Sequence, residues 1–293
     1  MSILIDKTTR ILVQGITTIE GRQHTSLMLE NKSEIVAGVS PGRYGQEVMG
    51  VPVYDKVSEA VKRHPVDLSV IFVPKNSVLQ AALEAMEAGI KTLVIVTGEI
   101  PVTETLKMKS FAQKKGVMIV GPGSAGVLIP GVCKVGTLTN EYVLKGEVGV
   151  IARTKGNEKK ICQSLYKEEI GASAIVSLGG EDIIGMGFDD LLEFLEDDEQ
   201  TQIVVIGGET AGRMEEDAAR YVAESNYPKP VIAYIFDKEK NPETANEKEK
   251  AFRESGVTVV EDMWEIGQII KESTEEESGG PPEKGVDNRP DGS

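Results

Sequence analysis

The sequence alternates short apolar runs with longer stretches of helical periodicity, and this rhythm constrains the fold more than any other feature. The apolar runs are rich in Val, Ile and Leu on both faces, as expected for strands that helices cover on both sides. Strands that alternate with helices of this length form right-handed βαβ units around a parallel sheet. In the first half, the pattern predicts strands at 10–14, 34–39, 68–73, 92–96 and 117–120, with helices at 77–88 and 104–115.

A Gly- and Pro-rich segment, 126–146, interrupts the rhythm and is predicted to be an interdomain connection with an edge strand. The alternation then resumes, so the chain is predicted to hold two α/β domains, 1–125 and a doubly wound 147–272. The acidic end, 273–293, is predicted to be a disordered tail because it has too few apolar residues to form a core. The second domain is predicted to contain strands 148–152, 174–177, 202–206, 230–235 and 258–260, and helices 158–169, 189–196, 214–225, 246–254 and 263–272.

Charge and cysteine usage limit the classes of function. The net charge of −15 disfavours nucleic acid or an anionic membrane as a partner. The sequence has no apolar run of about 18 residues and no signal-peptide core, so we expect no membrane span and no targeting segment. Cys133 and Cys162 lie far apart without metal-ligand spacing, which predicts no metal site and a reducing location, the cytoplasm or the mitochondrial matrix.

The turn after the first predicted strand has the composition of an anion-binding loop. Gly15 and Gly21 bracket it, but Thr17 stands where a dinucleotide fingerprint has its middle glycine. The second strand is followed by Arg43 instead of the acid that holds a ribose diol. A guanidinium binds a ribose phosphate, which a carboxylate would repel. The turn therefore predicts an anionic adenosine ligand such as CoA or NADP, with a solvated surface role for Arg43 as the alternative.

Several colinear blocks resemble the alpha subunit of succinyl-CoA synthetase. The likeness covers residues 6–272 and implies a Rossmann-like CoA-binding domain followed by a flavodoxin-like ligase domain. It favours CoA over NADP as the ligand of the first turn. The blocks are "QGITTIEGRQHT", "GVSPGRYGQEVMGVPVYD", "IFVPKNSVLQAALEAMEAGIKTLVIVTGEIP", "GPGSAGVLIPGVCKVG" and "SLGGEDIIGMGFDDLLEFLEDDEQTQIVVIGGETAGRMEEDAARYV".

The resemblance implies a set of CoA-binding residues in the loops that follow the strands of the first domain. Thr18 departs from the family pattern, which usually has Gly there, and a β-branched residue disfavours positive φ. Glu20 adds negative charge beside the proposed phosphate site, so both residues predict a reduced affinity for CoA. The matching residues are Thr17, Thr18, Ile19, Glu20, Gly21, Arg43, Val73, Pro74, Thr97, Gly98 and Glu99.

The phosphohistidine loop of the family has no counterpart in this chain. In the family it follows the strand that matches "PVIAYIF", but here that strand leads into "DKEKNPETANEKEKAFRESG", which has neither histidine nor glycine-rich loop. The two histidines are His24, predicted to pack locally on the first helix, and His64, predicted to be solvated. We therefore expect no phosphohistidine on this protein.

The second domain keeps only part of the family's phosphate site. Its matching turn, "ARTKGNEKK", offers Thr154, Lys155 and Gly156 as a candidate anion site at a helix N-terminus. The alternative is a basic turn with Asn157 as an ordinary N-cap. Glu209 matches the family glutamate that orients the phosphohistidine, and the other catalytic residues remain unknown.

Three functions are compatible with these observations. The resemblance implies an alpha-like subunit that binds CoA or acyl-CoA, acts on a small carboxylic acid and works with an ATP-grasp beta-like partner, through which alone it meets Mg-nucleotide. The second is a non-catalytic acyl-CoA-binding or regulatory paralogue. The third is a subunit of an acyl or carbamoyl transferase. CoA binding and a co-purifying beta-like subunit would distinguish these functions.

Overall fold

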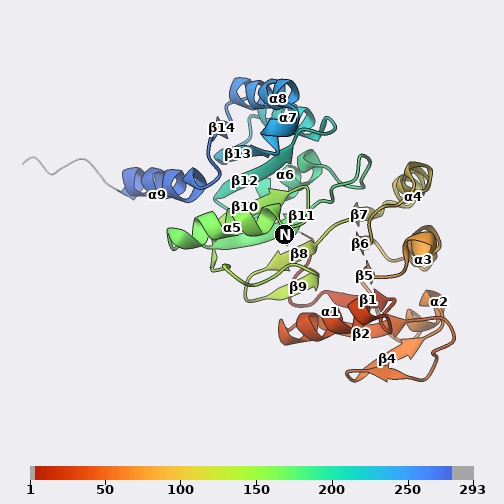
Figure 1. The fold of residues 1–293 in the computed structure, drawn as a ribbon. Coiled ribbons are helices and arrows are strands. Elements are labelled where there is room, and N and C mark those ends of the chain that lie inside the picture. The colour runs from red at the N-terminus through yellow and green to blue at the C-terminus, as the bar shows by residue number, and fades with distance from the viewer. Residues whose placement is uncertain (1–3, 279–293) are drawn as a thin grey trace, which may run out of the picture.

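The computed structural model describes residues 4–278, which form two α/β lobes (Figure 1). The first lobe surrounds a seven-stranded sheet with strand order β3-β4-β2-β1-β5-β6-β7. Its elements are β1 (Arg10–Gln14), α1 (Ile19–Glu30), β2 (Glu34–Val39), β3 (Glu47–Val48), β4 (Val51–Tyr54), α2 (Val57–Ala60), β5 (Leu68–Ile71), α3 (Val78–Glu87), β6 (Thr92–Ile95), α4 (Val102–Lys115) and β7 (Met118–Val120).

The parallel pairing of the first lobe brings several loops to one edge. Strand β1 pairs with β2 on one side and β5 on the other, and β6 continues the parallel sheet from β5. The strands are buried because their apolar side chains pack under helices on both faces. The turns that follow β1, β2, β5 and β6 therefore lie together at the carboxyl edge, where ligands bind in open α/β sheets.

The second lobe is also a seven-stranded sheet, with order β14-β13-β12-β10-β11-β8-β9. The strands from β14 to β11 pair in parallel, as in a flavodoxin-like sheet. Its elements are β8 (Gly126–Ile129), β9 (Cys133–Gly136), β10 (Lys145–Ala152), α5 (Asn157–Lys167), β11 (Ala172–Ser177), α6 (Phe188–Glu196), β12 (Ile203–Glu209), α7 (Met214–Ser225), β13 (Val231–Phe236), α8 (Pro242–Glu254), β14 (Thr258–Val259) and α9 (Glu265–Ser278).

The predicted fold class is confirmed, but two predicted boundaries differ from the observed elements. The segment expected to connect the domains contributes a hairpin, β8 and β9, which pairs antiparallel with β11 at the edge of the second sheet. Its alternate apolar residues, Val127 and Val135, are buried in the core. Helix α9 continues past Glu272 to Ser278, so part of the predicted tail is helical. Residues 279–293 lie outside the described part of the chain.

The two lobes are joined by contacts between elements far apart in sequence. Helix α1 packs on β9, where Ser33 Oγ donates to Lys134 O at 2.6 Å. On the other side, the backbone N–H of Met186 donates to Ile119 O at 2.8 Å. The first contact joins the end of α1 to β9, and the second holds the loop after β11 against β7 of the first sheet.

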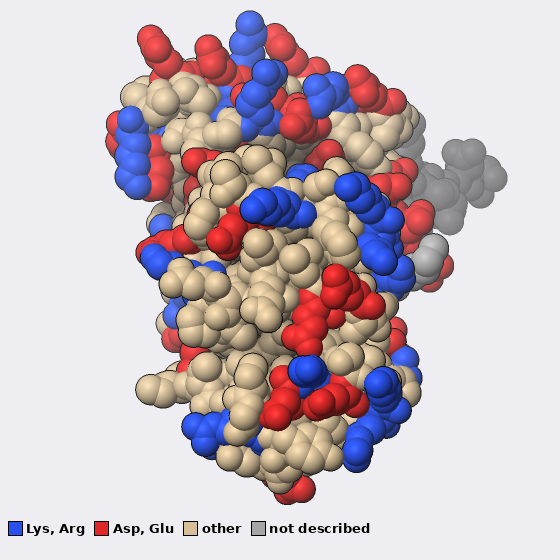
Figure 2. Space-filling view, turned by 90° about the vertical axis from the view of Figure 1, so that its right-hand side faces the viewer, with Lys and Arg blue, Asp and Glu red and all other residues tan. Residues whose placement is uncertain are grey.

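Charge is mixed on the side of the molecule that carries α3 and α4. Figure 2 shows acidic and basic side chains interspersed between broad uncharged areas on this face. No broad basic patch of the kind that binds nucleic acid is visible on it. Among residues 4–278, none of the helices combines the length and the apolar composition needed to cross a bilayer.

Candidate functional site

The turn between β1 and α1 depends on two glycines for its shape. Gly15 has φ of +79°, and a Cβ there would lie 2.9 Å from the backbone carbonyl of Phe72 at the end of β5. A Cβ at Gly21 would overlap the carbonyl oxygen of Gly15. The two glycines therefore let the start of α1 approach the ends of β1 and β5 closely.

Thr18 is the N-cap of α1 and is not strained. Its φ is −66°, so the conflict expected for a β-branched residue at this position does not arise. Its Oγ1 donates to Gly15 O at 2.8 Å and accepts from Gly21 N at 2.9 Å. Thr17 Oγ1 lies 2.7 Å from Ser40 Oγ, which ties this turn to the end of β2. The first-turn N–H groups of a helix lack partners within the helix, so they can receive an anion.

Arg43 is exposed at the end of the loop that follows β2. The backbone N–H groups of Arg43 and Tyr44 donate to Asp55 Oδ1 at 2.8 and 2.9 Å, which orders the loop. Within residues 4–278, the Arg43 guanidinium forms no ion pair or side-chain hydrogen bond. It is therefore available to an anionic ligand at the same sheet edge as the β1–α1 turn.

The remaining predicted CoA residues lie in the loops after β5 and β6. Thr97 Oγ1 donates to Val73 O at 2.7 Å, so these two loops are fixed to each other. Glu99 has φ of +57°, and its N–H donates to Glu181 Oε1 of the second lobe. The predicted CoA residues thus follow neighbouring strands at one edge, and the second lobe contacts that edge.

Lys155 extends from the second lobe toward the first. Its Nζ donates to Val96 O at 2.9 Å. Burial at the junction lowers the pKa of Lys155, although the nearby carboxylates of Glu20 and Glu158 oppose that shift. A cation of the second lobe therefore lies near the first glycine turn, a position that its place in the sequence does not reveal.

The N-terminus of α5 is occupied by a carboxylate of the protein itself. Gly156 is the N-cap, so Asn157 is the first helical residue and not the cap. Both carboxylate oxygens of Glu158 lie 2.9 Å from Gly156 N, and the residue is only 6% exposed. Burial raises the pKa of Glu158, while its backbone hydrogen bonds oppose the shift. An anion at Thr154, Lys155 and Gly156 would have to displace this carboxylate, and the predicted anion site stays a prediction.

A buried charge network, formed by Arg153, Glu215 and Lys248, lies behind this helix start. All three side chains are fully buried. Lys248 Nζ bonds Glu215 Oε2, and Arg153 Nη1 lies 3.8 Å from Glu215 Oε1. Both cations also donate to Ala211 O, and Glu209 N donates to Glu215 Oε1 at 2.8 Å. The network holds the turn after β12. We did not predict it, because Glu215 and Lys248 lie on amphipathic helices where charged residues usually face water.

Glu209 and the two histidines have local partners or packing. Asn157 Nδ2 donates to Glu209 Oε1 at 3.0 Å, so this carboxylate is engaged within the second lobe, and its expected match to a family glutamate stays a prediction. The His24 ring stacks on Phe72 with centroids 5.8 Å apart, and burial lowers its pKa. His64 Nε2 lies 2.8 Å from Tyr54 OH, so this histidine is hydrogen-bonded and not merely solvated. Both histidines belong to the first lobe.

The turn between β13 and α8 is short and polar. It runs from Asp237 through a 3₁₀ turn, Lys238–Lys240, to Asn241, which caps α8. Lys238 Nζ forms an ion pair with Glu249 Oε1 at 2.6 Å. This turn carries no histidine and offers no mobile glycine-rich loop.

Comparison with protein families matches both lobes. A CoA binding domain matches residues 6–98, and a succinyl-CoA ligase like flavodoxin domain matches residues 145–272. The succinate–CoA ligase (ADP-forming) subunit alpha 2 of Archaeoglobus fulgidus is 38% identical over 287 residues, covering 93% of this chain and 99% of that protein. The chain belongs to the succinate–CoA ligase alpha-subunit family. The alpha subunit from Staphylococcus epidermidis is 35% identical, with 92% of this chain and 94% of that protein covered.

Solved structures share the fold of this family member. ATP citrate lyase from Methanothrix soehngenii, in complex with citrate and coenzyme A, superposes with a TM-score of 0.83 at 20% identity. The match covers 94% of this chain but 51% of that one, so this chain spans about half its length. Acetyl-coenzyme A synthetase 1 of Ca. Korarchaeum cryptofilum gives a TM-score of 0.71 at 22% identity, covering 87% of this chain and 58% of that one.

Proposed function

We propose that this chain is the CoA-binding alpha-like subunit of an acyl-CoA synthetase of the succinate–CoA ligase type. The observation that carries the proposal is the convergence of the loops after β1, β2, β5 and β6, with the unpaired Arg43 guanidinium among them. An ATP-grasp beta-like subunit would supply Mg-nucleotide and complete a hetero-oligomer. The substrates would be a small carboxylic acid and CoA, or the acyl-CoA in the reverse direction.

Each loop has a defined task in this proposal. The first turn of α1 receives a CoA phosphate on its free N–H groups, with Thr18 holding the turn in shape. Arg43 binds a second phosphate through charge-assisted hydrogen bonds. The loops at Val73 and Thr97 guide the rest of the ligand along the sheet edge toward the second lobe. Coenzyme A supplies the thiol that becomes the thioester.

The acyl transfer is proposed to proceed without a histidine carrier. The thiol of CoA would attack the carbonyl carbon of an acyl phosphate made with the partner subunit. A C–S bond would form, the C–O bond to phosphate would break, and inorganic phosphate would leave. The support for this route is that both histidines of the chain lie in the first lobe, away from the turn between β13 and α8.

Calorimetry with CoA and NADP tests the ligand assignment. We expect CoA to bind the purified chain more tightly than NADP or ATP. Saturable binding of NADP with no response to CoA would contradict the proposal and favour the transferase alternative.

Labelling with radioactive ATP, magnesium and the co-purified partner tests the proposed histidine-free transfer. Acid-labile, base-stable label on His24 or His64 would overturn the histidine-free mechanism.

A non-catalytic acyl-CoA-binding protein is the second candidate function. The specific observation that favours it is Glu158, which fills the helix start that would otherwise hold phosphate. CoA binding without thioester formation in the presence of the native partner would support this candidate.

For either function we propose a reducing compartment, the cytoplasm or mitochondrial matrix, because Cys133 and Cys162 are free thiols.

A further inference from the structure

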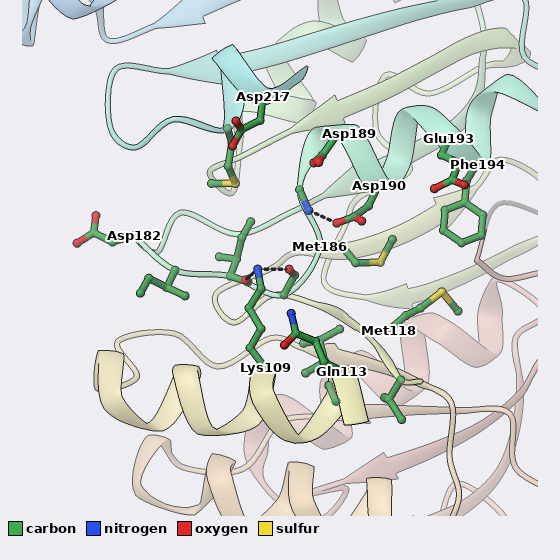
Figure 3. Close-up of a pocket in the computed structure, with 18 residues that line it drawn as sticks. Lys109, Gln113, Met118, Asp182, Met186, Asp189, Asp190, Glu193, Phe194 and Asp217 are labelled. Carbon is green, nitrogen blue, oxygen red and sulfur yellow. Dashed lines mark hydrogen bonds between the residues drawn. The ribbon is translucent and has the colours of Figure 1, made fainter. Parts of the chain in front are cut away.

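A cavity of about 600 Å³ lies between the two lobes and shares no lining residue with the candidate CoA loops (Figure 3). Its lower wall comes from α4 and the start of β7 in the first lobe. Its upper wall comes from the loop after β11 and from the first turns of α6 and α7 in the second lobe. The volume falls in the range of small-molecule sites.

Part of the cavity surface is formed by apolar side chains, several of them flexible methionines. Met118 lines it from the first lobe, and Met186 and Phe194 line it from the second (Figure 3). Met214 also lines it from the second lobe. Methionine side chains are flexible and polarizable, so they adapt to an alkyl chain. This part of the cavity is suited to methylene groups.

The charged groups of the cavity are almost all acidic. Its single lysine, Lys109, donates to Ile184 O at 3.0 Å and Gly185 O at 2.9 Å, so its ammonium is already engaged (Figure 3). Asp190 accepts from Gly187 N at 2.8 Å. The other lining carboxylates are Asp182, Asp189, Glu193 and Asp217.

Three of these carboxylates have no partner in the described part of the chain. Asp217 pairs with Arg220, but Asp182, Asp189 and Glu193 form no hydrogen bond or ion pair with their side chains within residues 4–278. Desolvation raises the pKa of Asp190, and the neighbouring charge of Asp189 acts in the same direction. A cation bound in the cavity would offset both effects, because a nearby positive charge favours the ionised carboxylate.

The acids are too dispersed to form a metal site. Among the described residues, no group of three or more His, Cys, Asp or Glu side chains is arranged to hold a metal ion. Carboxylates spread along a cavity that also has apolar side chains instead match a ligand whose positive charges are spaced by methylene groups.

We propose that this cavity binds a linear alkyl polyamine. Its methylene groups contact the methionines and Phe194, and its ammonium groups pair with the rim carboxylates, chiefly Asp189 and Glu193. Because both lobes line the cavity, the bound polyamine bridges them. The site shares no lining residue with the proposed CoA loops, so polyamine binding can be tested in the absence of CoA.

Calorimetry on the full chain, with 1,8-diaminooctane and spermidine as probes, tests the proposal. Octane-1,8-diol is the control ligand because it has the same carbon chain without charge. We expect both amines to give saturable one-site binding and the diol to give none. Equal binding of the diol and the diamine would overturn the proposal, because the rim carboxylates would then have no role.

Two matched variants distinguish diamine binding in the cavity from nonspecific attraction of the diamine to an acidic protein. The double variant Asp189→Asn, Glu193→Gln removes unpaired carboxylates and should weaken diamine binding about tenfold. Asp197→Asn, an exposed position at the end of the same helix and outside the cavity, should change it less than about twofold. A similar loss of diamine affinity in the two variants would show that the attraction is nonspecific, and it would overturn the proposal.

A third variant changes the wall of the cavity that the first lobe forms. Gln113 is exposed on α4 and lines the cavity, so Gln113→Lys adds a competing ammonium without disturbing the core. We expect it to weaken diamine binding about fivefold, with circular dichroism unchanged. Unchanged affinity in this variant, whether or not the double variant folds, would contradict the proposed position.

Discussion

The two lobes differ in the groups that lie at the N-terminus of a helix that follows a β-strand, α1 in the first lobe and α5 in the second. In the first lobe, Thr18 caps only Gly21 N, and the nearby Arg43 guanidinium has no partner within residues 4–278. In the second lobe, Glu158 fills the start of α5 and Asn157 engages Glu209. A turn with free N–H groups and a turn that is closed by a side chain of the protein can therefore both follow a β-strand. The difference lies in whether a buried carboxylate of the chain already accepts from a backbone N–H at the helix start, as Glu158 does from Gly156 N.

The largest expected effect comes from breaking the buried charge network. Lys248→Met should lower the free energy of unfolding by about 3–5 kcal/mol, because the buried Glu215 carboxylate keeps the Glu209 N–H donor but is left, within the described residues, with Arg153 at 3.8 Å as its cation. Chemical denaturation measures the loss. Lys250→Met is the control on the same helix, since Lys250 is exposed and pairs only with Glu254 at 3.7 Å. Equal stability of the two variants would mean that the closed turn does not depend on the network.

Removing the unpaired guanidinium should weaken the open site. Arg43→Ala is expected to reduce CoA binding by about 1.5–3 kcal/mol, the loss of a charge-assisted contact with phosphate. Calorimetry gives the dissociation constant directly. Arg213→Ala serves as the control, because Arg213 is exposed and lies in the second lobe. An unchanged dissociation constant for Arg43→Ala would return this residue to a solvated surface role.

The stability of the folded protein should depend on pH through Glu158, the carboxylate at the start of α5. Burial raises the pKa of Glu158 in the folded state, so its protonated form is favoured there. The contribution to stability is complete below the ordinary pKa of a glutamate and is lost as pH rises through the raised value. Glu158→Gln should remove this decline, as followed by thermal melts across that window. An identical pH profile in the variant and the wild type would remove Glu158 as the cause.

The same position offers a direct test of the contrast between the lobes. Glu158→Ser should let inorganic phosphate bind at the start of α5 with a dissociation constant of about 1 mM, while the wild type shows no phosphate binding there. Phosphate titration by NMR follows the N–H signal of Gly156. A wild-type response equal to that of the variant would show that Glu158 does not close the site.

The smallest effect is expected at the C-terminal end. Truncation after Glu272 removes the last part of α9, where Thr274 Oγ1 only donates to backbone carbonyls of its own helix. The melting temperature should fall by less than about 3 °C. Truncation after Ser278 is the control and should leave it unchanged. A fall of about 10 °C or more in the first protein would show that the end of α9 supports α5.

Much of the fold could be predicted because strand and helix periodicity is a local property. The predicted strands 10–14 and 34–39 coincide with β1 and β2, and the helix predicted at 77–88 corresponds to α3, Val78–Glu87. The antiparallel pair β3 and β4 was not predicted. Strand β3 has only two residues, Glu47–Val48, too few to show a period of two, and the pair exists because β4 adds to the edge of β2.

The first turn and Arg43 could be proposed from their residue types, while the other candidate CoA loops came from the resemblance to the family. Their position at one edge follows from the parallel pairing of the strands. The absence of a histidine after β13 was equally plain, since it needs no geometry. By contrast, the conformation of Thr18 was predicted from residue type alone, and its φ of −66° removes the expected strain. The capping role of its hydroxyl depends on how α1 approaches Gly15.

The sequence by itself determined the alternation of strands and helices, the glycine turns and the lack of a histidine between β13 and α8. Only the tertiary structure decided which charged side chains are buried and with what partners. Arg153, Glu215 and Lys248 come from separate elements, and Lys155 reaches Val96 in the other lobe. The physical reason is that periodicity records which local face is apolar. Desolvation and ion pairing depend on which distant elements meet.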